Sequence, residues 1–280
     1  MKLIKVSLII LLALLGVYQA VVFDRSKDIT DNAPIITSKT DEIEISCQYE
    51  KSDLLKDLTA YDVEDGYITD KILIGGFSNF TNRGVSSLEY AVYDTDGNIA
   101  TFTRKVIFSD YMPPKVTTSV PWAFKATDNP YSIPTLTVKG TDMIDGDISK
   151  HVLITADIDF SLPGRYVASV LMKNSFGDEV SLDLPVHILD PALSGFTIEL
   201  TEPVIYVEKD KKFNPEEYIV AVKNEYSGEI IPQEKYELTV QSNVDTSKDG
   251  IYEVRFFAAT SDNYQRGETW LTVVVGNYGG

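Results

Sequence analysis

The sequence predicts an all-β protein made of small sandwiches in tandem, preceded by one N-terminal transmembrane helix. Three observations predict it. The segments after residue 28 alternate apolar and polar residues or run apolar, and clusters of Asp, Asn, Gly and Pro separate them. Helical periodicity is scarce in this part of the chain, whereas β-branched and aromatic residues are frequent. Finally, a shift of 80 residues superposes one stretch of the chain on the next, as expected for tandem domains.

The N-terminal segment predicts export. Residues 6–23 form an apolar run of 18 residues behind Lys2 and Lys5, and about 17–25 apolar residues cross a bilayer core. A bulky Tyr18 obstructs the only cleavage position. We therefore expect residues 1–28 to remain as a membrane anchor, with removal as a signal peptide as the alternative. Lysines on the N-terminal flank place the rest outside, as the C-terminal ectodomain of a single-pass cell-membrane protein.

Composition excludes several classes of partner. The chain has 280 residues and a formal net charge of −17, so that the part after residue 23, without Lys2 and Lys5, carries −19. Such a surface repels nucleic acid and anionic lipid, and we expect no nucleic-acid partner. The single cysteine, Cys47, excludes an intramolecular disulfide, so that hydrophobic packing alone must hold the fold.

The internal repeat sets the domain boundaries. Matches at the 80-residue shift fall on residues that shape turns, among them Pro34 with Pro114, Asp62 with Asp142, Asp65 with Asp145, Gly84 with Gly164 and Gly97 with Gly177. We expect the four glycines to supply positive φ. The predicted domains are residues 29–111, 112–190 and, as a more divergent sandwich, 191–280.

Two corresponding segments of the repeat carry a family resemblance. Residues 62–68 read Asp-Val-Glu-Asp-Gly-Tyr-Ile, and residues 142–148 read Asp-Met-Ile-Asp-Gly-Asp-Ile; each follows an entry proline and precedes a glycine with an alternating strand. This pattern resembles the bacterial surface-protein immunoglobulin-like domain, the family that includes the immunoglobulin-like module of a pesticidal crystal protein and is similar to hyalin repeats. The resemblance implies an immunoglobulin-like sandwich used as a spacer or binding module. Tyr67 departs from it, because the family has a second aspartate there.

The aspartate turns of the first copy are the candidate metal site. Asp62, Asp65, Asp94 and Asp96 lie on loops with Glu64 and Asn98 beside them. Ca²⁺ takes six to eight oxygen ligands in flexible geometry, which makes these residues candidate calcium ligands. The alternative is that the aspartates only form turns by bonding their own backbone.

Nothing in the sequence predicts a catalytic centre. The two histidines, His151 and His187, lie 36 residues apart without a second ligand at metal spacing, and no nucleophile elbow, phosphate loop or dinucleotide fingerprint is present. We expect no enzyme and, apart from calcium, no cofactor.

The predicted function is that of a non-catalytic, membrane-anchored surface protein used for adhesion, scaffolding or spacing, which binds a surface protein or glycan. The alternative is an accessory or glycan-binding subunit of a cell-envelope assembly. A row of exposed aromatic side chains on a sheet face favours glycan binding, whereas an uncovered edge strand favours a protein partner. Aromatic residues are dense in the third domain: Tyr206, Tyr218, Tyr226, Tyr236, Tyr264 and Trp270.

Overall fold

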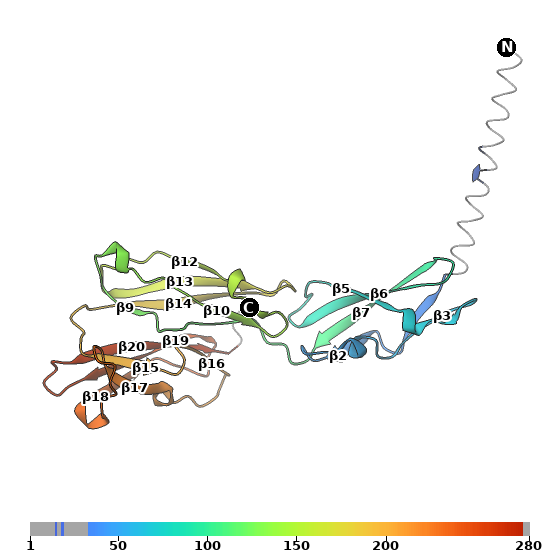
Figure 1. Ribbon diagram of the computed structural model, residues 1–280. Helices are drawn as coiled ribbons and strands as arrows, with labels where there is room; N and C mark the ends of the chain where they lie inside the picture. Colours follow the sequence, from blue (N-terminus) through green and yellow to red (C-terminus); the bar gives the residue numbers. More distant parts are fainter. Residues whose placement is uncertain (1–14, 16–17, 20–32, 277–280) are drawn as a thin grey trace, which may run out of the picture. The chain divides into compact units, whose positions relative to one another are not determined.

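A computed structural model describes residues 15, 18–19 and 33–276 of the chain, and it confirms the all-β prediction (Figure 1). Among these residues, no helix is both long and apolar enough to span a bilayer. The predicted anchor, residues 1–28, lies almost entirely outside the described residues. The chain divides into two compact units, Met1–Tyr111 and Met112–Gly280.

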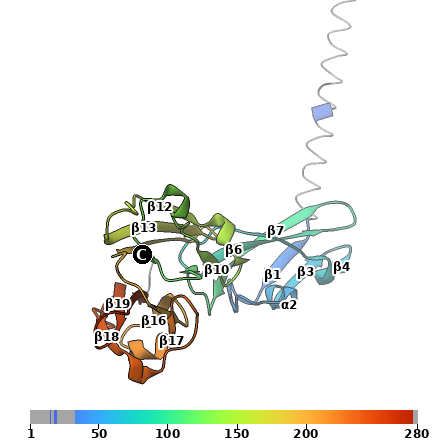
Figure 2. The ribbon, with the colours of Figure 1, turned by 60° about the vertical axis from the view of Figure 1, so that its left-hand side comes forward.

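The first unit contains one sandwich, which we call the first sandwich. Its elements are β1 (Ile35–Ser38), β2 (Glu42–Ile45), α2 (Lys51–Leu54), β3 (Leu58–Asp62), β4 (Gly66–Tyr67), β5 (Leu73–Phe77), β6 (Val85–Tyr93) and β7 (Ile99–Phe108). One sheet has the order β1-β3-β4 and the other the order β2-β7-β6-β5. Figure 2 shows β1, β3 and β4 in one layer and β6 and β7 in the other.

Strict alternation builds the core of this sandwich. Leu88, Tyr90 and Val92 on β6 are completely buried while the residues between them face outward. Burial of each such side chain contributes about 1.5–3 kcal/mol before the entropy of ordering is counted. The Tyr90 hydroxyl donates to the Leu54 carbonyl at 2.7 Å, so this buried polar atom is satisfied.

The second sandwich, in the second unit, repeats this topology. Its strands are β8 (Lys115–Thr117), β9 (Ala123–Lys125), β10 (Lys139–Asp142), β11 (Gly146–Asp147), β12 (Leu153–Ala156), β13 (Gly164–Lys173) and β14 (Glu179–Leu189). The sheets are β11-β10-β8 and β12-β13-β14-β9. The registers also repeat, because Ile35 pairs with Tyr61 in the first sandwich and Lys115 with Thr141 in the second.

The third sandwich completes the second unit and has a hydrophobic core of its own. Its strands are β15 (Phe196–Leu200), β16 (Val204–Val207), β17 (Ile219–Asn224), β18 (Glu237–Ser242), β19 (Gly250–Ala259) and β20 (Arg266–Val275), in sheets β15-β17 and β16-β20-β19-β18. Short 3-10 turns span Thr69–Lys71, Pro130–Ser132, Ser149–His151, Pro215–Tyr218 and Gln233–Lys235. Figure 1 shows β19 and β20 alongside β14 and β9.

The turn glycines follow the prediction at three of four positions. Gly84, Gly97 and Gly177 have φ of 74°, 85° and 82°. The prediction is wrong for Gly164, which does not have positive φ. The reason is its place in the ladder: Gly164 is already the first residue of β13 and pairs with Ile188, whereas Gly84 precedes its strand.

Candidate functional site

The predicted calcium ligand Asp62 organises a turn. It is buried, and its Oδ1 accepts hydrogen bonds from the backbone N–H groups of Glu64 and Asp65, both at 2.8 Å. Asp142 makes the same two bonds in the second sandwich, to Ile144 and Asp145 at 2.9 Å. Because both copies build this turn identically, its geometry needs no metal to explain it.

Asp65 ties that turn to the hairpin between β6 and β7. It accepts from the backbone N–H and the hydroxyl of Thr95 at 2.8 and 2.7 Å, and its Oδ2 lies 3.6 Å from Lys71 Nζ. The hydroxyl bond is the main reason that the pKa of Asp65 lies below its usual range. Asp145 and Ser175 repeat the contact at 2.6 and 2.7 Å.

Asp94 and Asp96 lie in that hairpin and differ from their counterparts. Asp94 accepts from the backbone N–H and the side-chain amide of Asn98 at 2.7 and 2.8 Å. Asn174 replaces it in the second sandwich and donates its amide to Asp142 at 3.1 Å, a bond that a carboxylate cannot make. The negative charge of Asp96 is the main cause of the raised pKa of Glu64.

The structure therefore gathers the predicted ligands at one end of the first sandwich, with most of their oxygens bonded to N–H and hydroxyl groups. Within the described part of the chain, no three His, Cys, Asp or Glu side chains are arranged so as to hold a metal ion. Calcium binding stays a prediction.

A second candidate site lies on the outer face of sheet β1-β3-β4. Ile35, Tyr61 and Tyr67 pair across the three strands and point outward, with 62%, 45% and 79% of their surfaces exposed. The rings of Tyr61 and Tyr67 contact edge to face, with centroids 5.4 Å apart. We call these three side chains the tyrosine face.

A polar strip continues the tyrosine face along β1 and β3. Next to Ile35 and Tyr61 comes the pair Thr37 and Thr59, whose hydroxyls are hydrogen-bonded at 2.7 Å. Beyond it, Lys39 Nζ lies 3.1 Å from Asp57 Oδ1. Ser38 and Leu58 join these four residues around an open cavity of about 310 Å³.

The second sandwich has no such face. The three positions that pair across its sheet carry Lys115, Thr141 and Asp147. The Lys115 ammonium instead lies 5.2 Å from the ring centroid of Tyr206 in the third sandwich. The exposed aromatic pair is thus a property of the first copy and not of the repeat.

A buried polar interface joins the second and third sandwiches. His187 on β14 is stacked on Trp270 of β20, with ring centroids 3.7 Å apart and planes 3° from parallel. Its Nε2 lies 2.5 Å from Glu253 Oε1 on β19, and Glu253 Oε2 accepts from Arg165 Nε at 2.7 Å. The side chains of His187 and Glu253 are only 7% and 10% exposed. Burial acts to raise the pKa of Glu253, but the hydrogen bonds from His187 and Arg165 outweigh it, so the pKa is lowered.

Tyr206 provides a second contact across this interface. Its hydroxyl accepts from the N–H of Val116 and donates to the carbonyl of Val116, both at 2.8 Å. Burial raises the pKa of Tyr206, so the phenol stays neutral and can donate. Of the six aromatic residues named above for the third domain, Tyr206 and Trp270 therefore face the second sandwich, whereas Tyr226 and Tyr264 are more than 80% exposed.

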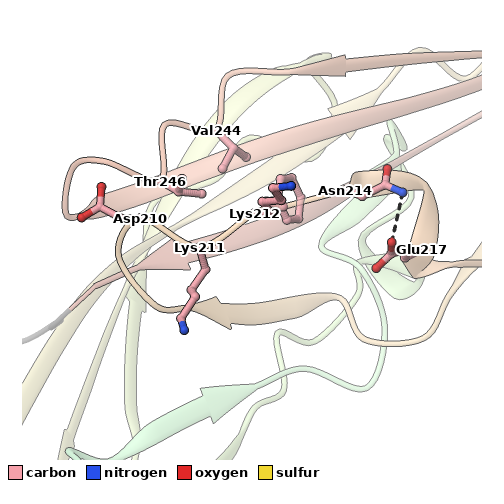
Figure 3. A pocket seen from close by; sticks show the side chains of 8 residues that line it. Asp210, Lys211, Lys212, Asn214, Glu217, Val244 and Thr246 are labelled. Atoms are coloured by element: carbon pink, nitrogen blue, oxygen red, sulfur yellow. Dashed lines mark hydrogen bonds between the residues drawn. The ribbon is translucent and has the colours of Figure 1, made fainter.

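The third sandwich also carries an open cavity of about 570 Å³ beside the loop before Asn214. Figure 3 shows that its charged groups do not converge: Asp210 and Lys211 point away from each other, and Asn214 donates to Glu217 at 3.2 Å. This cavity offers no set of groups directed at one ligand.

Sequence reasoning missed both the tyrosine face and the interface. Period-2 alternation in β3 already places Tyr61 on the outer side, and the 80-residue shift already contrasts Tyr67 with Asp147. No local pattern indicates that His187 contacts Glu253, which lies 66 residues away.

Comparisons with known proteins give partial matches. No family model matches the chain. The pesticidal crystal protein Cry22Aa of Bacillus thuringiensis is 29% identical over 157 residues, which are 54% of this chain and 20% of that protein. The chain thus spans about a fifth of the curated relative that it matches.

Solved structures match with low TM-scores. A Clostridium perfringens ZmpB structure, of CBM51-2 with GlcNAc and INT domains, is 35% identical over 30% of this chain and 17% of that one, with a TM-score of 0.23. Drosophila N-cadherin EC1-3 is 12% identical over 85% of this chain and 98% of that one, with a TM-score of 0.31.

Proposed function

We propose that this chain is a non-catalytic adhesion protein of the bacterial cell surface, held to the membrane by its N-terminal segment. One observation supports recognition by the first sandwich: the tyrosine face exposes two tyrosines and an isoleucine side by side, where the repeat's second copy has lysine, threonine and aspartate. Exposed aromatic residues gathered on one surface are typical of binding sites.

The second unit fits a rigid structural part of the same protein. A stacked histidine, a buried glutamate bonded to His187 and Arg165, and a tyrosine bonded to a strand backbone connect the second and third sandwiches. Such an interface restricts motion between the two domains, since buried hydrogen-bonded groups cost free energy when separated.

The test is binding of the labelled full chain to intact cells of the bacterium that encodes it. We expect saturable binding by the wild type and at least tenfold weaker binding by Ile35→Lys/Tyr61→Thr/Tyr67→Asp, which installs the second copy's residues. Tyr226→Asp, at an equally exposed tyrosine of the third sandwich, is the matched control. Equal binding by the wild type and the triple variant would refute recognition through this face.

A further inference from the structure

We propose that the tyrosine face and the polar strip beside it bind an uncharged oligosaccharide. This inference rests on the proposed function, because it names the ligand of the same surface. The two tyrosines are the stacking platform, and the strip supplies the hydrogen bonds.

The order of side chains along β1 and β3 matches the chemistry of a sugar chain. Every second residue faces outward, so the surface changes in steps of about 6.6 Å. It runs from the ring of Tyr61, through the hydroxyls of Thr37 and Thr59, to the ion pair of Lys39 and Asp57. From Tyr61 to Asp57 this surface is about 13 Å long, which is the length of a short oligosaccharide.

Each step offers what one part of a pyranose needs. The negative face of an aromatic ring attracts weakly positive C–H groups, and a sugar ring presents such groups on one face. A threonine hydroxyl both donates and accepts, as sugar hydroxyls do. Lys39 and Asp57 add a charged donor and a charged acceptor, which form stronger hydrogen bonds than neutral groups.

The size of the tyrosine face argues against a protein ligand, and the charge of the chain argues against a polyanion. A stable protein interface takes roughly 20–30 residues on each side, whereas the tyrosine face consists of three side chains. A polyanion would be repelled by a chain of net charge −17, and the strip's one lysine is already paired with Asp57. An uncharged ligand with apolar and hydroxyl surfaces meets neither obstacle.

The experiment is a printed array of uncharged, sialylated and sulfated oligosaccharides probed with the full chain at low and high salt. We expect retention on uncharged glycans that hardly changes with salt, since no counterion is released. No retention above background, or retention on the anionic glycans alone with loss at high salt, would overturn the proposal.

Variants assign the binding to this surface. We expect Tyr61→Thr/Tyr67→Asp to weaken binding to the best-retained glycan at least tenfold and Thr37→Val/Thr59→Val to weaken it severalfold, while Tyr226→Asp leaves it unchanged. Melting curves of all variants should match the wild type because the substituted side chains are exposed. Undiminished glycan binding by the tyrosine double variant would overturn the assignment.

Periodate treatment of the target cells separates this inference from the proposed function, because periodate cleaves the vicinal diols of glycans. Loss of cell binding after treatment supports an oligosaccharide ligand. Cell binding that needs Tyr61 and Tyr67 but survives periodate would overturn the oligosaccharide and leave the adhesion role intact.

Discussion

The last strands of the first two sandwiches, β7 and β14, are copies of one segment, yet only β14 is buried on both faces. Two inward positions are apolar in each, with Val106 and Phe108 matching Val186 and Ile188. The outward positions differ: Lys105 and Ile107 on β7 and Ser109 just after it correspond to Pro185, His187 and Leu189 on β14, and all three of the latter are buried. Three outward residues therefore decide whether a strand docks another domain, while the inward residues preserve the sandwich.

In the sheets β1-β3-β4 and β11-β10-β8 it is the first sandwich, not the second, that carries the apolar outer face. The first sandwich exposes an aromatic row on β1-β3-β4, and the second carries polar residues in the same register. The second copy docks the third sandwich through β14, whereas the first copy has the tyrosine face that we propose as a binding surface. The two copies share their turns and core but differ on their outer faces, so the repeat does not imply a shared function.

The largest expected effect concerns the core position where the two strands differ most. Arg104 on β7 is 1% exposed and donates to the Lys56 carbonyl at 2.7 Å and to Thr40 Oγ1 at 2.9 Å. Its counterpart is Leu184. Arg104→Ala removes both bonds and leaves a cavity, so we expect a loss of about 3 kcal/mol.

Arg104→Leu sharpens the same comparison, because leucine fills much of the volume and removes the cost of burying a charge. We expect it to cost about 2 kcal/mol less than the alanine variant. Hydrogen exchange of peptides from β6 and β7, measured by mass spectrometry in the full chain, reports the stability of this sandwich. Equal protection in both variants would show that volume at this position is unimportant.

His187→Ala breaks the interface that distinguishes β14. The variant loses the stack on Trp270 and leaves Glu253 with Arg165 as its remaining charged partner, so we expect about 2–3 kcal/mol of destabilisation. Urea unfolding followed by tryptophan fluorescence reports this unit, because both tryptophans lie in it. His151→Ala is the control: His151 is exposed, and its loss should change stability by less than about 0.5 kcal/mol.

Acid should weaken the same interface. The pKa of Glu253 is lowered in the folded protein, so its carboxylate contributes stability above the unfolded value of about 4.3. That contribution is lost as pH falls through the lower, folded pKa. We expect the tryptophan-detected melting temperature to fall between pH 6 and pH 3, and the Glu253→Gln variant to lack this part of the fall. Parallel pH curves for the two proteins would contradict the assignment.

Features of the fold and the site could be predicted where the interacting residues lie close together in the sequence. Alternation and turn residues are local, so strands such as β6 and β13, the sandwich class and the turns around Asp62 follow from the sequence. The docking of the third sandwich does not follow, because Arg165 and Glu253 are 88 residues apart and no local pattern couples them. The tyrosine face lies between these cases: alternation orients Tyr61, but only the strand register shows that Tyr67 lies beside it.

Tyr206→Phe tests the second contact of the interface with a smaller change. It removes one hydroxyl that bonds both the N–H and the carbonyl of Val116, and we expect a loss of about 1–2 kcal/mol in the same fluorescence assay. Tyr226→Phe, at an exposed tyrosine, should have no measurable effect. If Tyr206→Phe is equally silent, the hydroxyl makes no net contribution to the stability of the interface.

The smallest effect concerns calcium, where the two copies also differ. Asp94 and Asp96 in the first sandwich correspond to Asn174 and Phe176 in the second, so any calcium site should belong to the first. A bound cation would also relieve the repulsion between Asp96 and Glu64 that raises the pKa of Glu64. Since fewer anionic ligands weaken calcium binding, Asp96→Asn should lower the affinity, whereas Asp178→Asn in the second sandwich should not. The measurement is calorimetric titration of the full chain with Ca²⁺, repeated with Mg²⁺. Saturable heat from Ca²⁺ that Asp96→Asn diminishes would establish the site. No heat at millimolar Ca²⁺ would leave Asp62 and Asp65 with the turn-forming bonds that both copies share.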